Sequence, residues 1–251
     1  MLKAALIGFY NMHRNNNPWE IIKKLSDWGY RAVENGGFLL HGDVNENLQK
    51  MADMNFTTLS LATDMNGLQN NLDDIMQKMQ TIKVNKLCCY WSDAQSFDEA
   101  VSNAKIFDKA GEILSKNNFF LCYHNHDHEF KKSFNGVRYF DILMTETSPE
   151  NVYLNLDVGW ASFVIENVPE LVRRFNKRIK IMHFKDFYDF NIHESFTALS
   201  TGKVKIQDIL VAANDIGMDY ITVEQDTVRN LNTDDTVLLS YLTLKESGLV
   251  E

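Results

Sequence analysis

Short apolar segments alternate with helical patterns along the whole chain, and this alternation constrains the fold more than any other feature. The segments that we predict to be strands are Ala4–Phe9, Arg31–Asn35, Thr57–Ala62, Lys86–Trp91, Phe119–His124, Val152–Asp157, Ile179–His183 and Tyr220–Glu224. Strands separated by helices pair in parallel, and nearly continuous apolar strands are typical of a sheet covered on both faces. Eight such units within 251 residues predict one domain, residues 1–251, folded as a single (β/α)8 TIM barrel.

Two helix starts support this division of the chain. In Asn17-Pro18-Trp19-Glu20 a capping residue precedes a proline at the first helical position, and Ser96-Phe97-Asp98-Glu99 has the pattern of a capping box. An open, doubly wound sheet is the alternative architecture. Such a sheet usually carries a glycine-rich phosphate loop after its first strand, whereas this chain has Ile7-Gly8-Phe9-Tyr10-Asn11 there.

The composition limits the partners that we expect. The net charge is -9, from 25 basic and 34 acidic side chains, so we expect no nucleic-acid partner, which would need a basic surface. No apolar stretch approaches the roughly 18 residues of a membrane span, and the N-terminal apolar run is too short for a signal peptide. The three cysteines do not form a disulfide framework. We therefore expect a cytoplasmic protein with no membrane partner. Whether it forms a homo-oligomer stays open.

Charged and imidazole side chains stand at the ends of the last four predicted strands. These ends read His124-Asn125-His126-Asp127-His128-Glu129, then Asp157, then His183-Phe184-Lys185-Asp186, then Glu224-Gln225-Asp226. Active-site residues of a barrel come from the C-terminal strand ends, and buried charges there are costly unless they are paired or bind a metal. Any one of these residues can simply mark the exit to a loop. Four successive strands favour one divalent ion held in common, Mn²⁺, Co²⁺, Zn²⁺ or Mg²⁺.

Side-chain alternation predicts which residues of the fifth strand face the site. Residues two apart on a strand point to the same face, so His126 should follow His124 inward, and Asn125 should point away from both. If the chain has left the strand by Asn125, Glu129 can instead swing back as the metal ligand. The choice among His124, His126 and Glu129 stays open at this point.

At these strand ends the chain resembles the xylose-isomerase-like barrel superfamily, and within it the sugar phosphate isomerase/epimerase group. The matching segments are Tyr123-His124-Asn125-His126-Asp127-His128-Glu129-Phe130, Leu156-Asp157-Val158-Gly159-Trp160, His183-Phe184-Lys185-Asp186 and Val223-Glu224-Gln225-Asp226. The resemblance extends over almost the full length, from Gly29-Tyr30 to the closing helix. Four motifs in the right order make it specific for the group, although not for a substrate.

The resemblance implies one divalent ion held by residues on strands five to eight, with Asp157, His183 and Glu224 as ligands. Many members place a glutamate at the position of His124, where it is also a catalytic base. This chain departs from that pattern, so His124, His126 and Glu129 all stay open for the place, and we take His124 as the fourth ligand. A second departure lies in the seventh loop, where a glycine-rich turn is usual and this chain has Ser200-Thr201-Gly202-Lys203.

The reaction that we expect is a proton transfer next to the carbonyl of a small sugar or sugar-derived substrate, as in sugar isomerases and epimerases. A divalent ion polarises the carbonyl and stabilises an enediolate, while Glu224, His126 or Glu129 removes the proton. Lys185 supplies positive charge to the developing oxyanion, or is a strand-end lysine paired with a neighbouring carboxylate.

Four residues are candidates for contact with the substrate: Glu34, Asn125, Trp160 and Asp226. Trp160 and Trp91 can each offer a hydrophobic wall to a sugar ring. For Trp91 we favour a place in the core.

Three other functions compete with an isomerase. Inosose dehydratases and 3-keto-glycoside lyases resemble this chain in the histidine cluster of strand five, so a sugar dehydratase or lyase using the same site is the main alternative. Endonuclease IV, a DNA repair enzyme of the same superfamily, needs further metal ligands on early strands, and here these end in Phe9-Tyr10, Leu61-Ala62 and Tyr90-Trp91. A barrel that binds a ligand without catalysis is the third alternative.

Overall fold

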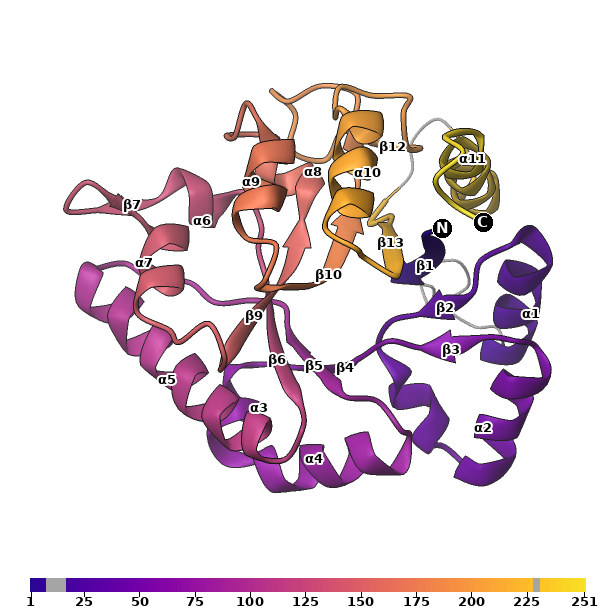
Figure 1. Ribbon diagram of the computed structural model, residues 1–251, viewed down its shortest axis with the longest axis horizontal. Helices are drawn as coiled ribbons and strands as arrows, with labels where there is room; N and C mark the ends of the chain where they lie inside the picture. The colour runs from indigo at the N-terminus through magenta and orange to yellow at the C-terminus, as the bar shows by residue number, and fades with distance from the viewer. Residues whose placement is uncertain (8–16, 228–230) are drawn as a thin grey trace.

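One large parallel sheet curls around a central axis and is surrounded by helices (Figure 1). The computed structural model describes residues 1–7, 17–227 and 231–251, so the predicted strand end at Gly8 and Phe9 lies outside the described residues. The strands of the sheet are β1 (Lys3–Ile7), β2 (Ala32–Val33), β3 (Thr57–Thr58), β4 (Leu61–Thr63), β5 (Lys86–Cys89), β6 (Phe120–His124), β9 (Val152–Asp157), β10 (Ile179–Phe184) and β13 (Tyr220–Glu224).

The predicted third strand is divided in two, and this division explains why the sheet has nine strands. β3 pairs with β2 and β4 pairs with β5, both in parallel. Leu59 and Ser60 lie between them, where the N–H of Leu59 donates to the carbonyl of Val33 and the carbonyl of Ser60 accepts the N–H of Gly36. The strand order is β3-β2-β1-β13-β10-β9-β6-β5-β4, with β3 at one edge and β4 at the other. Because only Leu59 and Ser60 separate β3 from β4 in the chain, the two edges lie together and the sheet closes into a barrel.

Helices follow the strands and form the outer layer (Figure 1). They are α1 (Pro18–Trp28), η2 (Gly36–Leu40, a 3-10 helix), α2 (Val44–Asp53), α3 (Met65–Asn70), α4 (Leu72–Thr81), α5 (Phe97–Lys116), α6 (His128–Lys131), α7 (Tyr139–Thr145), α8 (Val158–Ala161), α9 (Val168–Arg174), α10 (Ile206–Asp215) and α11 (Thr233–Glu246). Both predicted caps are present, since Asn17 accepts the backbone N–H of Trp19 and Ser96 that of Glu99. Within the described ranges, no helix combines the length and the apolar character needed to cross a membrane.

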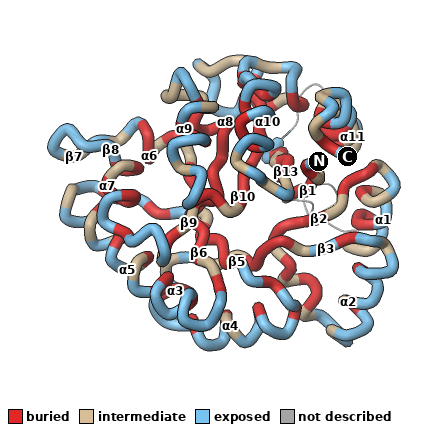
Figure 2. Tube along the Cα trace, viewed as in Figure 1, coloured by how far each residue is buried: buried red, intermediate tan, exposed pale blue. Residues whose placement is uncertain are grey.

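Alternation along the strands sorts the buried residues into two layers, and the burial follows the strands closely (Figure 2). The larger layer packs between the sheet and the helices. The smaller layer faces the barrel axis and consists of two clusters: Ala5, Ala32 and Leu59, and Cys88, Cys122 and Ile181. The cysteines of the chain, all buried, are free thiols.

The apolar interior of the barrel continues directly into polar side chains at the C-terminal strand ends. Cys122 and Ile181 face the axis, and residues two further along a strand point the same way. His124 therefore follows Cys122 inward on β6, and His183 follows Ile181 inward on β10. The strand geometry alone brings these two imidazoles toward one another.

The loop after β10 is shaped by Asp186. This residue begins β11 (Asp186–Phe187), which pairs with β12 (Phe196–Thr197), and its buried carboxylate accepts the N–H groups of Phe187, Gly202 and Val204. A Cβ at Gly202 would lie 2.4 Å from Oδ1 of Asp186. The one glycine of the unusual seventh loop therefore stands where only a glycine fits. A second small pair, β7 (Ser133–Phe134) and β8 (Val137–Arg138), forms a hairpin.

Candidate functional site

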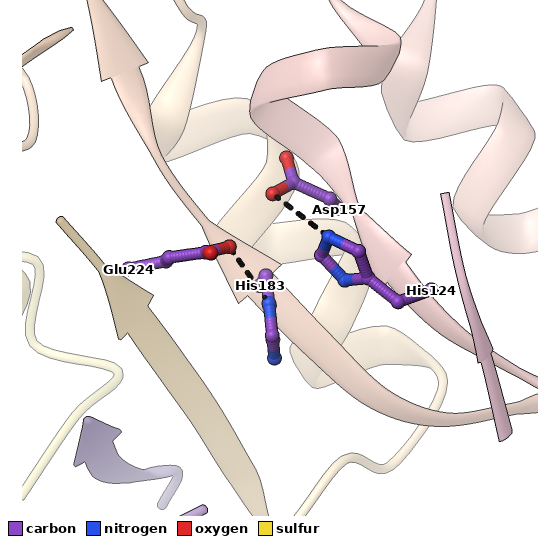
Figure 3. Close-up of side chains that lie close together, drawn as sticks. All are labelled: His124, Asp157, His183 and Glu224. Atoms are coloured by element: carbon purple, nitrogen blue, oxygen red, sulfur yellow. Dashed lines mark hydrogen bonds and ion pairs between the residues drawn. The ribbon is translucent and has the colours of Figure 1, made fainter. Parts of the chain in front are cut away.

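Four side chains from four neighbouring strands meet at one end of the barrel (Figure 3). They are His124 of β6, Asp157 of β9, His183 of β10 and Glu224 of β13, and we refer to them as the inner site. One ligand atom of each lies within 4.8 Å of those of the other three. Nε2 of His124 is 4.0 Å from Oδ2 of Asp157, and Nδ1 of His183 is 2.9 Å from Oε2 of Glu224. Two imidazoles and two carboxylates at these separations form a donor set suited to a divalent ion.

Two buried atoms of the inner site lack a hydrogen-bond partner within the described part of the chain. Oδ1 of Asp157 accepts the backbone N–H of Trp160 at 2.7 Å, but Oδ2 has no partner, and neither has Nδ1 of His124. Burial raises the pKa of Asp157 to about 8, because a buried carboxylate is costly unless its oxygens are satisfied. The ammonium of Lys185, 3.6 Å from Oδ2, offsets only part of that cost. A cation bound directly to Oδ2 would offset more of it, so these residues fit a metal ion.

Glu34 holds His183 from behind. Its Oε1 accepts a hydrogen bond from Nε2 of His183 at 2.9 Å, which leaves Nδ1 of the ring directed at the inner site. Its Oε2 accepts from Tyr90, Asn155 and Ser60. A carboxylate bonded to the second nitrogen is the usual support of a metal-binding histidine. Glu34 is completely buried and bonded on both oxygens, contacts that suit a positioning residue, and its predicted contact with substrate stays a prediction.

The charges around His183 stabilise a cation at its position. Burial opposes protonation of the ring, but Glu34 and Glu224 on its two sides raise the pKa of His183 to about 10. Burial also opposes ionisation of Glu34, and His183 nevertheless holds the pKa of that carboxyl below its usual value. The same carboxylates would stabilise a metal ion bound to Nδ1.

Lys185 reaches into the inner site, as its alternation with His183 predicts. Its ammonium nitrogen is 2.7 Å from Asp226, 3.2 Å from Glu224 and 3.6 Å from Asp157. Burial favours the neutral amine, yet these carboxylates hold the pKa of Lys185 above its ordinary value. Asp226 is the hydrogen-bond acceptor of this ammonium and keeps 38% of its side chain exposed, so the predicted contact of Asp226 with substrate stays a proposal.

His126 lies beside the inner site, on the same side of the chain as His124. The centroids of these two rings are 4.8 Å apart, and the ring of His126 is 5.8 Å from that of Trp160. Burial, together with the charge of Lys185, lowers the pKa of His126 to about 4. The imidazole is therefore neutral near neutral pH and able to accept a proton.

Glu129 and Asn125 are engaged by the protein itself. Oε1 of Glu129 accepts the hydroxyl of Tyr123, and Oε2 accepts the backbone N–H of His126, so Glu129 does not swing back to the inner site, and that alternative is wrong. The amide of Asn125 donates to the carbonyl of Asp157 and accepts its N–H. Asn125 is completely buried in this bridge between β6 and β9, and its predicted contact with substrate stays a prediction.

Of the two tryptophans, Trp160 is buried beside the inner site and Trp91 is exposed. Trp160 is 3% exposed and packs against Phe187, with Lys185 at 4.7 Å from its ring centroid. Trp91 is 55% exposed, so its predicted place in the core is wrong. Its ring lies against His126 and His128, with centroids 5.0 and 4.6 Å apart. The strand ends at Cys89, two residues earlier than predicted, which leaves Trp91 on the loop.

Solved structures of xylose isomerase-like TIM barrels superpose on essentially the whole chain. No family model and no curated protein matches the sequence. The structural likeness confirms the predicted (β/α)8 barrel and, at the level of the fold, the resemblance to the sugar phosphate isomerase/epimerase group.

Three of these structures represent the range of neighbours. A sugar phosphate isomerase/epimerase from Parabacteroides distasonis superposes with a TM-score of 0.83 at 20% identity, over 100% of this chain and 96% of that one. The probable 3-DHS dehydratase AsbF from Bacillus anthracis superposes with a TM-score of 0.80 at 13% identity, over 97% of this chain and 99% of that one. An IOLI protein with a bound zinc atom superposes with a TM-score of 0.76 at 15% identity, over 98% of both chains.

Proposed function

We propose that this protein is a divalent-metal-dependent enzyme that moves a proton next to the carbonyl of a small sugar-like substrate, as an isomerase or epimerase. The observation that carries the proposal is the inner site, where four donors come from four neighbouring strands and Oδ2 of Asp157 has no hydrogen-bond partner among the described residues. The likeness of fold to a sugar phosphate isomerase/epimerase and to a zinc-binding IOLI protein supports it.

The inner site would hold Mn²⁺, Co²⁺, Zn²⁺ or Mg²⁺ through His124, Asp157, His183 and Glu224. When bound, such an ion polarises a carbonyl and stabilises negative charge on its oxygen. Lys185 brings a second positive charge to the same place. Because its ammonium is almost completely buried, its field is screened less than in water.

Two groups beside the inner site can exchange a proton with the substrate. Burial opposes the charge of Glu224, but Lys185 and His183 hold its pKa well below the usual value, so it is an ionised carboxylate. His126 is a neutral imidazole on a different strand. If one removes the proton and the other, having taken a proton from water, delivers that proton to the opposite face, the carbon is epimerised. If the group that removed the proton returns it to the neighbouring carbon, the result is isomerisation.

A dehydratase or lyase reaction is the second candidate. The fold is shared with a probable 3-DHS dehydratase, and the first step, removal of a proton next to a carbonyl, is the same. If His126 removes that proton and then delivers it to an oxygen on the next carbon, the bond between that carbon and oxygen breaks, and an unsaturated ketone and an alcohol or water result.

Deuterium exchange tests the proposal. The protein, loaded separately with each of the four ions, is incubated in D₂O with a panel of ketoses, inososes and 3-keto-glycosides. We expect deuterium at the carbon next to the carbonyl of at least one substrate, and the product distinguishes isomerase from lyase. Asp157→Asn serves as the matched control and should show no exchange. No uptake by any ion-loaded form with any substrate would refute the proposal.

A further inference from the structure

A second group of potential metal ligands lies next to the inner site, and its members are His126, His128 and Glu129. One ligand atom from each lies within 4.8 Å of those of the other two. We propose that these three residues, which we refer to as the outer site, bind a second divalent cation. They belong to the turn after β6 and the first residues of α6, and Glu129 is completely buried.

The hydrogen bonds of His128 leave one ring nitrogen directed at Glu129. Nε2 of His128 is 2.9 Å from the backbone carbonyl oxygen of Ser92. A carbonyl oxygen only accepts hydrogen bonds, so Nε2 carries the hydrogen. In the neutral ring Nδ1 then presents a lone pair to Oε2 of Glu129, 3.3 Å away. Two lone pairs that face each other require a proton or a cation between them.

The distance between these two atoms suits a shared metal ion. Two donors that each lie about 2.1 Å from a tetrahedral ion are about 3.4 Å apart, close to the observed 3.3 Å between Nδ1 of His128 and Oε2 of Glu129. The bond from His128 to the carbonyl of Ser92 is also the kind of support that metal-binding histidines have on their second nitrogen.

Glu129 is held in place as a ligand would be. Its Oε1 accepts the hydroxyl of Tyr123, at 2.5 Å, and its Oε2 accepts the backbone N–H of His126, at 2.8 Å. The hydroxyl of Tyr123 is in turn bonded by Ser92. An ionised carboxylate oxygen can accept more than one bond, so Oε2 keeps room for a cation on the side of His128.

His126 completes the outer site, and with a cation bound there the removal of the substrate proton in the proposed function would fall to Glu224. Its Nδ1 is buried and has no hydrogen-bond partner among the residues that the structure describes. Its ring stacks with that of His128 at 5.9 Å between centroids, while its other neighbour, His124, belongs to the inner site. Two imidazoles and one carboxylate suit Zn²⁺ or Co²⁺ better than Mg²⁺ or Ca²⁺, and three protein ligands leave a position open for water or a substrate oxygen.

Zn²⁺ stoichiometry distinguishes a second cation from an ion pair between His128 and Glu129. Metal-free protein is equilibrated with excess Zn²⁺, passed through a desalting column and analysed for bound zinc. We expect two equivalents for the unaltered protein, and one for each of His128→Gln, Glu129→Gln and Asp157→Asn, the last having lost the inner ion. His41→Gln, a change of an exposed histidine, should keep two.

Two results would overturn the outer site. One is a single equivalent in the unaltered protein that Asp157→Asn removes, which leaves the inner site intact as a proposal. The other is retention of two equivalents by both His128→Gln and Glu129→Gln. Far-UV circular dichroism and the melting temperature of each metal-free variant ensure that a lost equivalent reflects a lost ligand. Glu129→Gln can keep its carbonyl oxygen on the backbone N–H of His126 and donate its amide to the hydroxyl of Tyr123, which can turn to accept, and is therefore the variant expected to fold like the parent.

Discussion

Replacing Glu34 by glutamine should weaken metal binding although Glu34 contributes no ligand atom. The glutamine oxygen can keep the bond to Nε2 of His183 only if its amide nitrogen takes the place of Oε2. There it faces Tyr90, Ser60 and the side-chain amide of Asn155. The two hydroxyls can turn to accept, but the amide of Asn155 only donates from that atom. In the opposite orientation the amide nitrogen would face Nε2 of His183, which also donates.

The loss of metal affinity follows from the two orientations that the glutamine amide can adopt. Either one buried donor at Asn155 loses its acceptor or His183 loses the carboxylate that orients it. Loss of such a supporting group weakens metal affinity by about 10- to 100-fold, which corresponds to about 1.4 to 2.7 kcal/mol. Removal of a negative charge next to the ligand acts in the same direction.

Competition between the protein and a chromophoric zinc chelator measures the change directly. Glu246→Gln, at the exposed end of α11, is the control with the same chemical change and should bind as the parent does. Equal affinities of the Glu34→Gln variant and the parent would mean that Glu34 does not support a ligand, and the assignment of Nδ1 of His183 to the metal would lose its basis.

Three further outcomes are expected. Asp157→Asn should lose the inner ion in elemental analysis and nearly all turnover while its circular dichroism stays that of the parent; a variant that kept both ion and turnover would contradict the inner site. Lys185→Met should retain the ion, since it removes an ammonium that competes for Asp157 and Glu224, but lose at least about 100-fold in turnover; equal turnover would exclude Lys185 from catalysis. Burial raises the pKa of Cys89 to about 12, and all three thiols are buried, so a disulfide reagent at pH 8 should label them only after denaturation, with rapid native labelling as the contrary result.

The periodicity of the strands made most of the barrel predictable. Val152–Asp157 and Tyr220–Glu224 form strands with the predicted bounds, because a strand that is buried on both faces is a short apolar run with a polar end. Alternation then placed Lys185 next to His183 correctly. The break at Leu59 and Ser60 was not predictable, because nothing in the residues from Thr57 to Ala62 marks an interruption of the strand. The break follows from where the backbone of Leu59 and Ser60 forms its hydrogen bonds, with Val33 and Gly36.

Hydrogen-bond partners that lie on different strands could not be predicted from the sequence. Glu34 stands at a strand end as the candidate ligands do, and only the position of His183, far along the chain, shows that its carboxylate bonds to a candidate ligand. Asn125 likewise bonds to Asp157 on the next strand of the sheet. A local pattern gives the direction of a side chain but not the identity of its partner, so supporting residues and substrate contacts look alike in the sequence.

The charges of the inner site explain why a metal ion and a lysine can share it. Four carboxylates surround it, those of Glu34, Asp157, Glu224 and Asp226, and Lys185 neutralises only one of them. Metal binding requires a neutral His183 and an ionised Asp157, and in that state three negative charges would remain in a buried region, where such an excess is costly. A divalent ion would leave one, so the ammonium and the ion together nearly balance the carboxylates. In the proposed function the lysine would therefore not be a substitute for the metal, and both positive charges would be available to an oxygen that becomes negative during proton transfer.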